Sequence, residues 1–555
     1  MKGSVFMSSR IELIPLSSLS KVFLEQTPEP GYVGGSMLKN EKYSFQVAYT
    51  VSAEMEARPF IATLKIESPL KDFISIRLVG NLPSVTPIYP NKFDDNYLSI
   101  DSGLFPDPLY KINRSEVKVL PNKWQSIWVI IEGSKNLAQG KYPIKITFCN
   151  SEKGLESTVS IEVEVVNCEL PDQDLIYTNW FHADCIASVY NCDVFSEEHW
   201  KLIEQFVDVA AKYGMNMILT PAFTPPLDTP IGDERITVQL VDVYKDGNNY
   251  EFNFDRLNRW IDICLEKGIS YFEHSHLFTQ WGAKFAPKVV GYENDEYKKM
   301  FGWDTSATSK EYVNFLQQYL PSVISFFKKK NIDDKIYFHI SDEPTIDNLE
   351  TYAKAVGIVK DYLQGYKVFD ALSSFEFYKK GLVPIPVPTT SHFNDFLGKV
   401  DEPWLYYTGG QCIKYSNRFF SMPSTRNRIL GTQMYKYDIK GFLQWAYNFY
   451  YTTMSKEICN PLFSTDAFGE FPSGTAYMVY PGCDGPIESL RLVVFNEGIQ
   501  DIRAMKCLES YIGKDGVMQI IEENIDPITL SEYPKTEKYL LDMRNRINRE
   551  IAKYN

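Results

Sequence analysis

The sequence has no long hydrophobic run. No segment approaches the roughly 18 consecutive apolar residues that a membrane-spanning helix needs. The stretch from Ile11 to Ser20, after the positively charged start, is interrupted by Glu12, Pro15 and several serines, so it lacks the apolar region of a secretory signal peptide. We expect a cytoplasmic protein without a membrane span.

Several functional motifs are also missing. The nine cysteines show no C-x-x-C spacing, and we expect them to be free thiols in a reduced compartment. There is no P-loop, no dinucleotide fingerprint after a strand and no nucleophile elbow, which disfavours a nucleotide cofactor and acyl-transfer chemistry. We expect no cofactor and no metal. The net charge of -14, without a long run of lysine or arginine, argues against a nucleic-acid partner.

The chain is long enough for two or three domains, with 555 residues of which 44% are hydrophobic. From Met1 to about Leu170, short half-buried segments alternate with turn signals such as Gly34-Gly35, which is typical of a β-sandwich. The clearest strand segments are 123–132, 142–149 and 157–166. Pro171 to Asp174 then marks a linker.

Beyond the linker, strand patterns alternate with helical patterns, as in a parallel (β/α)8 barrel of the TIM type. The expected strands are 176–181, 216–222, 269–276, 335–340, 367–373, 384–390, 404–408 and 441–447. The clearest helical segments are 197–213, 255–267, 309–330 and 346–363. The predicted fold is therefore multidomain, all-β and α/β, with a β-sandwich over residues 1–170 and a (β/α)8 catalytic barrel with C-terminal helices over residues 171–555.

Two adjacent carboxylates follow the fourth expected barrel strand. Residues 335–340 are mostly β-branched or aromatic, and Pro344 cannot donate to a sheet ladder. Asp342 and Glu343 therefore fall where the strand gives way to a loop. In a (β/α)8 barrel that edge is the catalytic face.

Polar and aromatic residues gather at other expected strand ends. The polar set contains Asn179, Trp180, His182, Asp184, Glu273, His274, His276, Asp370, Ser373 and Ser374. The aromatic set contains Tyr406, Tyr407, Trp445 and Tyr447, with Trp281 and Trp303 from the insertion after the third strand. Aromatic rings pack against the less polar face of a pyranose, and fixed polar groups bind its hydroxyls. Together these residues predict a sugar substrate.

The spacing of the two acids bears on the mechanism. A retaining glycosidase with a protein nucleophile places two carboxylates about 5 Å apart on opposite sides of the sugar, which neighbouring residues cannot easily achieve. Asp342 and Glu343 are therefore expected on one side. The nucleophile would then come from the substrate, for example the carbonyl oxygen of a 2-acetamido group. One acid would hold that amide while the other protonates the leaving group.

Three motifs resemble the glycoside hydrolases of family 123: Ser-Asp-Glu-Pro at 341–344, Tyr-Thr-Asn-Trp-Phe-His at 177–182, and the segment 480–491. Members of this family are retaining β-N-acetylgalactosaminidases with a β-sandwich followed by a (β/α)8 barrel, and the resemblance spans nearly the whole chain. It implies release of terminal β-linked GalNAc from oligosaccharides, including glycosphingolipid glycans, through an oxazolinium-like intermediate. It also implies that Glu343 is the general acid and base and that Asp342 orients the acetamido group.

This division of labour requires Glu343 to hold a proton near neutral pH, which an ionised Asp342 beside it would favour. Further substrate-binding candidates are chosen by position rather than by motif. They are Asn179, Trp180, His182, His276, Tyr407, Trp445, Asp484 and Arg491.

Simpler structural interpretations remain open for these residues. The Asp-Glu-Pro triplet could cap the following helix, and Asp484 could form a structural ion pair with Arg491. A zinc site could form from Glu273, His274 and His276, and the aromatics Tyr406, Trp445 and Tyr447 could belong to the core.

The functional alternatives are a β-N-acetylhexosaminidase that prefers GlcNAc, a glycosidase with Glu273 or Asp370 as nucleophile, and a glycan-binding protein without activity. The sequence carries no indication of oligomeric state.

Overall fold

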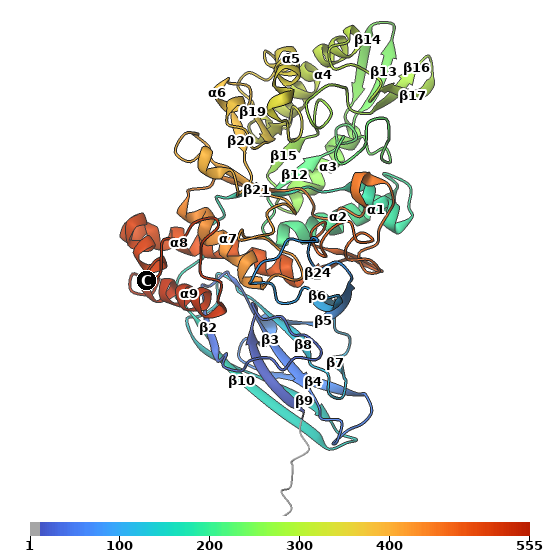
Figure 1. Cartoon of the computed structure of the whole chain (residues 1–555). Helices are drawn as coiled ribbons and strands as arrows, with labels where there is room; N and C mark the ends of the chain where they lie inside the picture. Colours follow the sequence, from blue (N-terminus) through green and yellow to red (C-terminus); the bar gives the residue numbers. More distant parts are fainter. Residues whose placement is uncertain (1–10) are drawn as a thin grey trace, which may run out of the picture. The chain divides into compact units, whose positions relative to one another are not determined.

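The computed structural model describes residues 11–555, which fall into two compact units (Figure 1). Unit 1 contains the residues up to Gln173 together with Ser416–Lys436 and Ile487–Asn555, and unit 2 contains Asp174–Tyr415 and Tyr437–Pro486. Residues 1–10, which we included in the predicted β-rich region, lie outside the described residues. Within residues 11–555, none of the helices combines the length and the apolar character needed to cross a bilayer.

Unit 1 is built on two sheets. The first has the order β1-β3-β8-β5-β6, with β24 pairing with β6 at Glu488 and Ser489, and the second has the order β2-β10-β9-β4-β7. The strands of the first sheet are β1 (Glu12–Ser17), β3 (Lys42–Thr50), β5 (Ile74–Ser84), β6 (Gly103–Lys111), β8 (Gln125–Glu132) and β24 (Gly485–Ser489). Those of the second are β2 (Gly34–Met37), β4 (Phe60–Glu67), β7 (Glu116–Val119), β9 (Gly140–Asn150) and β10 (Leu155–Val165).

The two sheets share one hydrophobic core. Buried side chains of β3 and β8, such as Phe45 and Val129, belong to the same cluster as Leu64 of β4 and Ile146 of β9. In β4 buried and exposed residues alternate along Phe60–Lys65, because successive side chains of a strand point to opposite faces. The three strand segments that the sequence predicted most clearly correspond to β8, β9 and β10.

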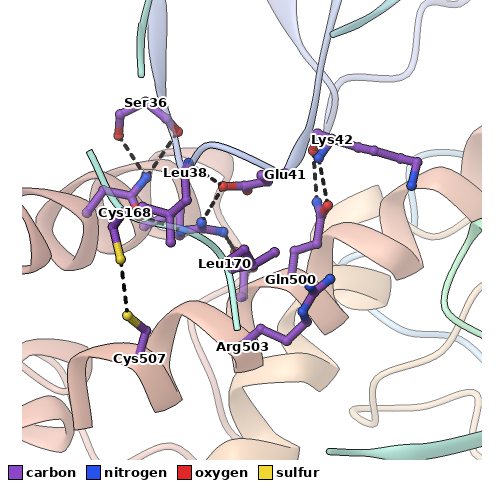
Figure 2. A network of polar contacts seen from close by, with 12 residues as sticks. Ser36, Leu38, Glu41, Lys42, Cys168, Leu170, Gln500, Arg503 and Cys507 are labelled. Atoms are coloured by element: carbon purple, nitrogen blue, oxygen red, sulfur yellow. Dashed lines mark hydrogen bonds and ion pairs between the residues drawn. The ribbon is translucent and has the colours of Figure 1, made fainter. Parts of the chain in front are cut away.

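Three helices also belong to unit 1, namely α7 (Ser424–Lys436), α8 (Leu490–Ile521) and α9 (Glu537–Ile551). We had assigned the C-terminal helices to the barrel, and the structure groups them instead with the N-terminal sheets. Polar contacts account for the difference: Gln500 of α8 exchanges two hydrogen bonds of 2.8 Å with the backbone of Lys42 (Figure 2). In α9, Arg544 donates to Glu41 at 2.7 Å and to Asp501 at 3.0 Å.

Unit 2 contains a nearly closed barrel of eight parallel strands in the order β20-β19-β18-β15-β12-β11-β22-β21. Backbone bonds between Tyr406 and residues 388 and 390, of 3.0 and 2.9 Å, join the two end strands. The strands are β11 (Ile176–Asn179), β12 (Met217–Thr220), β15 (Tyr271–His274), β18 (Ile336–Phe338), β19 (Lys367–Ala371), β20 (Ile385–Val387), β21 (Trp404–Tyr407) and β22 (Gly441–Gln444). Each of the eight expected barrel strands is present.

The helices of unit 2 follow the predicted alternation with strands. They are α1 (Ala183–Tyr190), α2 (Glu197–Lys212), α3 (Asp255–Glu266), α4 (Lys310–Lys329), α5 (Leu349–Val359) and α6 (Glu376–Lys379). Four of these, α2 to α5, correspond to the four predicted helical segments.

An additional small sheet in unit 2 was not anticipated. It has the order β14-β13-β16-β17 and is formed by β13 (Asp242–Asp246), β14 (Asn249–Asn253), β16 (Val289–Glu293) and β17 (Glu296–Phe301). These strands come from the insertions that follow β12 and β15. Trp281 and Trp303 lie in the second insertion, on either side of β16 and β17.

Candidate active site

The acid pair lies just beyond the end of β18. Asp342 and Glu343 are half-buried, and the hydroxyl of Tyr406 donates to Glu343 Oε1 at 2.7 Å. Glu343 has a φ of 42°, a left-handed conformation that costs a non-glycine residue about 1–3 kcal/mol and is often found at functional sites. Its backbone N–H donates to the carbonyl of Ala371 at 3.1 Å, which helps to hold that conformation.

The acids do not cap the next helix. The following 3-10 turn, Ile346–Asn348, begins after Thr345, whose side chain forms a capping box with Asn348. The capping positions are thus already filled, and the alternative in which the acid pair serves as a helix cap is not supported. The two carboxyl groups are left for another use.

The pKa of Asp342 is raised well above its ordinary value, first by burial and then by the neighbouring Glu343 carboxyl, while the charge of His339 opposes the rise. A neighbouring negative charge disfavours the ionised form of a carboxyl group. We had expected an ionised Asp342, whereas the structure raises the pKa of its carboxyl group.

The tip of β11 places Trp180 inside the barrel. Its indole Nε1 donates to Glu273 Oε2 at 2.9 Å, and its ring lies edge-on to His276 with centroids 5.4 Å apart. His276 is fully buried, and neither of its ring nitrogens has a hydrogen-bond partner among residues 11–555. Burial and the nearby charge of His339 lower the pKa of His276 well below its ordinary value, so its neutral imidazole can both donate to and accept from a ligand.

His182 and Asp184 are held by a residue that the sequence did not single out. Arg235 donates to both oxygens of Asp184, at 2.8 and 2.9 Å, and to Nδ1 of His182 at 3.1 Å. The other ring nitrogen of His182 donates to the carbonyl of Trp445 at 3.0 Å. Burial and Arg235 lower the pKa of His182 to about 3, so this neutral ring links Arg235 to the Trp445 backbone.

Two predicted contact residues face away from the barrel interior. Asn179 donates to the hydroxyl of Tyr177 at 3.3 Å, and both Tyr177 and Tyr407 pack against Phe442. Trp180 and Tyr406, one position away along each strand, belong to the interior core instead. Because side chains alternate between the two faces of a strand, Tyr406 rather than Tyr407 reaches Glu343.

The remaining candidates are dispersed. Trp445 is half-buried and packs against Phe449 and Phe471. Asp484 lies exposed in the turn before β24. Arg491 belongs to unit 1, where it forms a buried ion pair with Asp107 at 2.9 and 3.0 Å. The alternative in which Arg491 forms a structural ion pair with Asp484 is therefore not supported, because its partner is Asp107.

Tyr447 and Trp281, two further aromatic candidates, have different roles in the structure. The hydroxyl of Tyr447 donates to the backbone of Phe206 in α2, so this ring belongs to the packing between strand and helix. Trp281 donates its backbone N–H to the carbonyl of Asp342 at 2.8 Å and leaves 39% of its surface exposed. It is therefore the insertion tryptophan tied directly to the acid pair.

Two further buried carboxylates, Glu273 and Asp370, are fully engaged. Glu273 accepts from Thr178, Trp180 and His339, and Asp370 accepts from Tyr352, from His339 and from the backbone N–H groups of residues 340 and 341. Both are completely buried. Neither is free to attack a sugar, which argues against the alternatives with Glu273 or Asp370 as nucleophile.

The proposed zinc ligands do not converge. Both ring nitrogens of His274 are used, one toward Ser275 O at 2.6 Å and one toward the Tyr319 hydroxyl at 2.7 Å. Among the described residues, His276, His339 and Asp370 have potential ligand atoms within 4.8 Å of one another. Both nitrogens of His339 are occupied by carboxylates, so this trio does not fit a metal ion either.

Comparisons with known proteins agree with this geometry. The model of the family described as "Glycoside hydrolase 123, catalytic domain" matches residues 180–508. A family 123 glycoside hydrolase from Clostridium perfringens, described in connection with glycolipid glycan hydrolysis, has 15% identity and a TM-score of 0.74, with 98% of each chain covered. The comparison with curated proteins gave no match.

A second solved structure is more distant. A family 5 glycoside hydrolase from Bacteroides vulgatus has 9% identity and a TM-score of 0.33, covering 62% of this chain and 68% of its own, a similarity too low to carry an argument. The likeness to the Clostridium perfringens enzyme shows the fold. Because the family model also covers more than half of the 555 residues, this chain belongs to glycoside hydrolase family 123.

Proposed function

We propose that the protein is a retaining exo-β-N-acetylgalactosaminidase that uses the 2-acetamido group of its substrate as the nucleophile. One observation carries the mechanism: Asp342 and Glu343 are neighbours on one strand tip, whereas Glu273 and Asp370, the two carboxylates considered as nucleophiles, are engaged in hydrogen bonds. A double displacement needs a nucleophile on the far side of the sugar from the acid. The acetamido oxygen supplies it.

In the first step Glu343 donates its proton to the glycosidic oxygen as the C1–O bond breaks. The acetamido carbonyl oxygen attacks C1 from the opposite face and closes an oxazolinium ring, and the aglycone leaves as an alcohol. In the second step Glu343 takes a proton from water, the water oxygen bonds to C1, and the ring opens. Two inversions at C1 leave the β configuration unchanged.

Asp342 supports the ring closure by accepting the acetamido N–H. A hydrogen bond to the charged form of a carboxyl group favours its ionisation, so binding of the acetamido N–H favours the ionised form of Asp342. Tyr406, which donates to Glu343 at 2.7 Å, fixes the orientation of that carboxyl group.

The substrate class follows from the same site. Trp180 and Trp281 offer rings for the apolar face of a sugar, and His276 offers two free nitrogens in a buried setting. The family resemblance favours GalNAc over GlcNAc. The similarity to the Clostridium perfringens enzyme, described for glycolipid glycans, supports glycolipid oligosaccharides as the natural class.

Hydrolysis of 4-nitrophenyl β-GalNAc, beside 4-nitrophenyl β-GlcNAc, tests the proposal. We expect release from GalNAc, with β-GalNAc as the first anomer seen by NMR and inhibition by a thiazoline analogue. Removal of a general acid and base costs about 10²–10⁴-fold in rate, so Glu343→Gln should lose that much on substrates with poor leaving groups. Glu350→Gln, at an exposed residue of α5, is the matched control and should retain full activity.

The other outcomes distinguish the alternatives. Preferential release of GlcNAc would replace the substrate, and initial formation of the α anomer would overturn the retaining mechanism. Binding of β-GalNAc without turnover by the folded protein would leave only glycan recognition. Near wild-type activity of Glu343→Gln on an alkyl glycoside would remove the assigned acid.

A further inference from the structure

A buried histidine connects two carboxylates behind the acid pair. His339 Nε2 lies 2.9 Å from Glu273 Oε2, and His339 Nδ1 lies 3.0 Å from Asp370 Oδ1. All three side chains are completely buried. Glu273 and Asp370 also accept from Trp180, Tyr352 and two backbone N–H groups, as ionised carboxylates do. A carboxylate accepts from a ring nitrogen only where that nitrogen carries a proton, so between two carboxylates His339 holds both ring protons and a positive charge.

Each end of this arrangement holds a part of the active site. At one end Glu273 accepts from the indole N–H of Trp180 at 2.9 Å. At the other end Asp370 accepts the backbone N–H groups of Ile340 and Ser341, both at 3.1 Å. These two peptide groups lie immediately before Asp342 and Glu343, so a continuous polar path runs from the tryptophan ring to the acid pair.

The charges around His339 explain why it is protonated. The charged and titratable groups that face it are Glu273, His274 and His276 from β15 and its following loop, Asp370 from β19, and Asp342 from its own segment. Burial lowers the pKa of His339, but the hydrogen bonds and charges of Asp370 and Glu273 outweigh it and raise the pKa to about 9. The imidazolium also opposes the rise in the pKa of Asp342.

We propose that His339, as an imidazolium clamped between Glu273 and Asp370, is a positioning residue that fixes Trp180 relative to the Asp342–Glu343 pair. The proposal deepens the proposed function and rests on it for its catalytic consequence. When His339 loses a proton, one of its nitrogens faces a carboxylate with a lone pair and that bond is lost. The tryptophan ring and the acid pair then lose their common support, and turnover declines on the alkaline side.

The kinetic test compares His339→Gln with His274→Gln. His274 is an equally buried histidine of β15, but it bonds Ser275 and Tyr319 outside this path. We expect His339→Gln to lower kcat for aryl β-GalNAc about 10- to 100-fold, as misplacement of a catalytic group by about 1 Å does, with a smaller change in KM. Similar losses in the two variants would show a general effect of burial and would overturn the proposal, as would wild-type kinetics in His339→Gln.

Glu273→Gln provides a conservative second variant in case His339→Gln does not fold. It keeps the shape and an acceptor for Trp180 but removes one negative charge from His339. The alkaline limb of the kcat profile, expected near pH 9 in the wild type, should move to lower pH. An alkaline limb that does not move would contradict the assignment to His339.

A measurement without substrate separates this proposal from the proposed function. The chain has six histidines, so ¹⁵N-histidine NMR of the intact protein can follow each ring. We expect one ring, absent in His339→Gln or altered in Glu273→Gln, to keep both protons up to about pH 9. If no ring is doubly protonated at pH 8, the clamp is wrong even in an active enzyme. If the clamp is seen but no aminosugar glycoside is hydrolysed, the proposed function fails instead.

Discussion

Replacing Arg491 by methionine should unfold unit 1 more easily without acting on the sugar directly. Arg491 and Asp107 expose 2% and 0% of their side chains, and two hydrogen bonds of 2.9 and 3.0 Å join them. Removing one member of a buried pair leaves an unpaired charge and costs about 3–5 kcal/mol. At about 2–4 °C per kcal/mol for a domain of this size, the midpoint of thermal unfolding should fall by about 6–20 °C.

Calorimetry and steady-state kinetics on the same preparations measure both consequences. Arg546→Met is the control, because Arg546 pairs with Glu523 at the surface, where the Glu523 side chain is 57% exposed, and such pairs contribute about 0–1 kcal/mol. An Arg491→Met protein that melts like the wild type but has a KM at least tenfold higher would refute the structural role. It would restore Arg491 as the substrate contact that its position in the sequence first indicated.

Three further changes test the packing and the charges. Asp342→Asn should raise the melting temperature at pH 7: a carboxyl group whose pKa is raised on folding stabilises the protein below its unfolded pKa near 4 and loses that contribution as pH rises. The gain should vanish in melts at pH 4, and equal melting at pH 7 would contradict it. Lys21→Met should stabilise the protein most below pH 7, because burial lowers the pKa of Lys21 to about 7 and the cost of the buried charge fades between about pH 7 and 10. Urea unfolding at pH 6 and pH 9.5 measures this difference. A gain in unfolding free energy that is the same at both pH values would contradict the reasoning. Gly431→Ala should lower the free energy of unfolding by about 1–3 kcal/mol or more, since its Cβ would lie 2.1 Å from the carbonyl oxygen of Gly498. The control is Gly357→Ala in α5, whose Cβ meets no atom within 4 Å and which should be neutral or stabilising in urea unfolding.

The barrel could be predicted because its strands are local patterns. Each is a short apolar segment followed by a helix, and the acid pair is adjacent in the sequence to the strand that carries it. The faces of the strand ends were harder to predict. At the ends of β11 and β21, polar or aromatic residues stand side by side, so the pattern does not show that Trp180 and Tyr406 point inward while Asn179 and Tyr407 point outward.

Contacts between segments that are distant in the chain could not be predicted from the sequence. Arg491 and Asp107 are 384 positions apart, and no local pattern relates them. Arg235 lies in a loop without regular structure, so nothing marked it as the partner of Asp184. Of these residues, only His339 could have been found from a local pattern. It follows Tyr337 by two residues, so both lie on the same face of the strand that leads directly to the acid pair.

The order of segments in unit 1 has a consequence for synthesis. Its two sheets are complete in sequence by Gln173, except for β24, but Arg544 of α9 and Gln500 of α8, which bond Glu41 and the backbone of Lys42, are translated much later. At about 5–20 residues per second, roughly 20 to 80 s separate the synthesis of Gln173 from that of Ile551 at the end of α9. Until these segments are made, Glu41 lacks Arg544 as its ion-pair partner and β6 lacks its pairing with β24. Unit 1 therefore acquires its last contacts only after all the barrel strands have been synthesised.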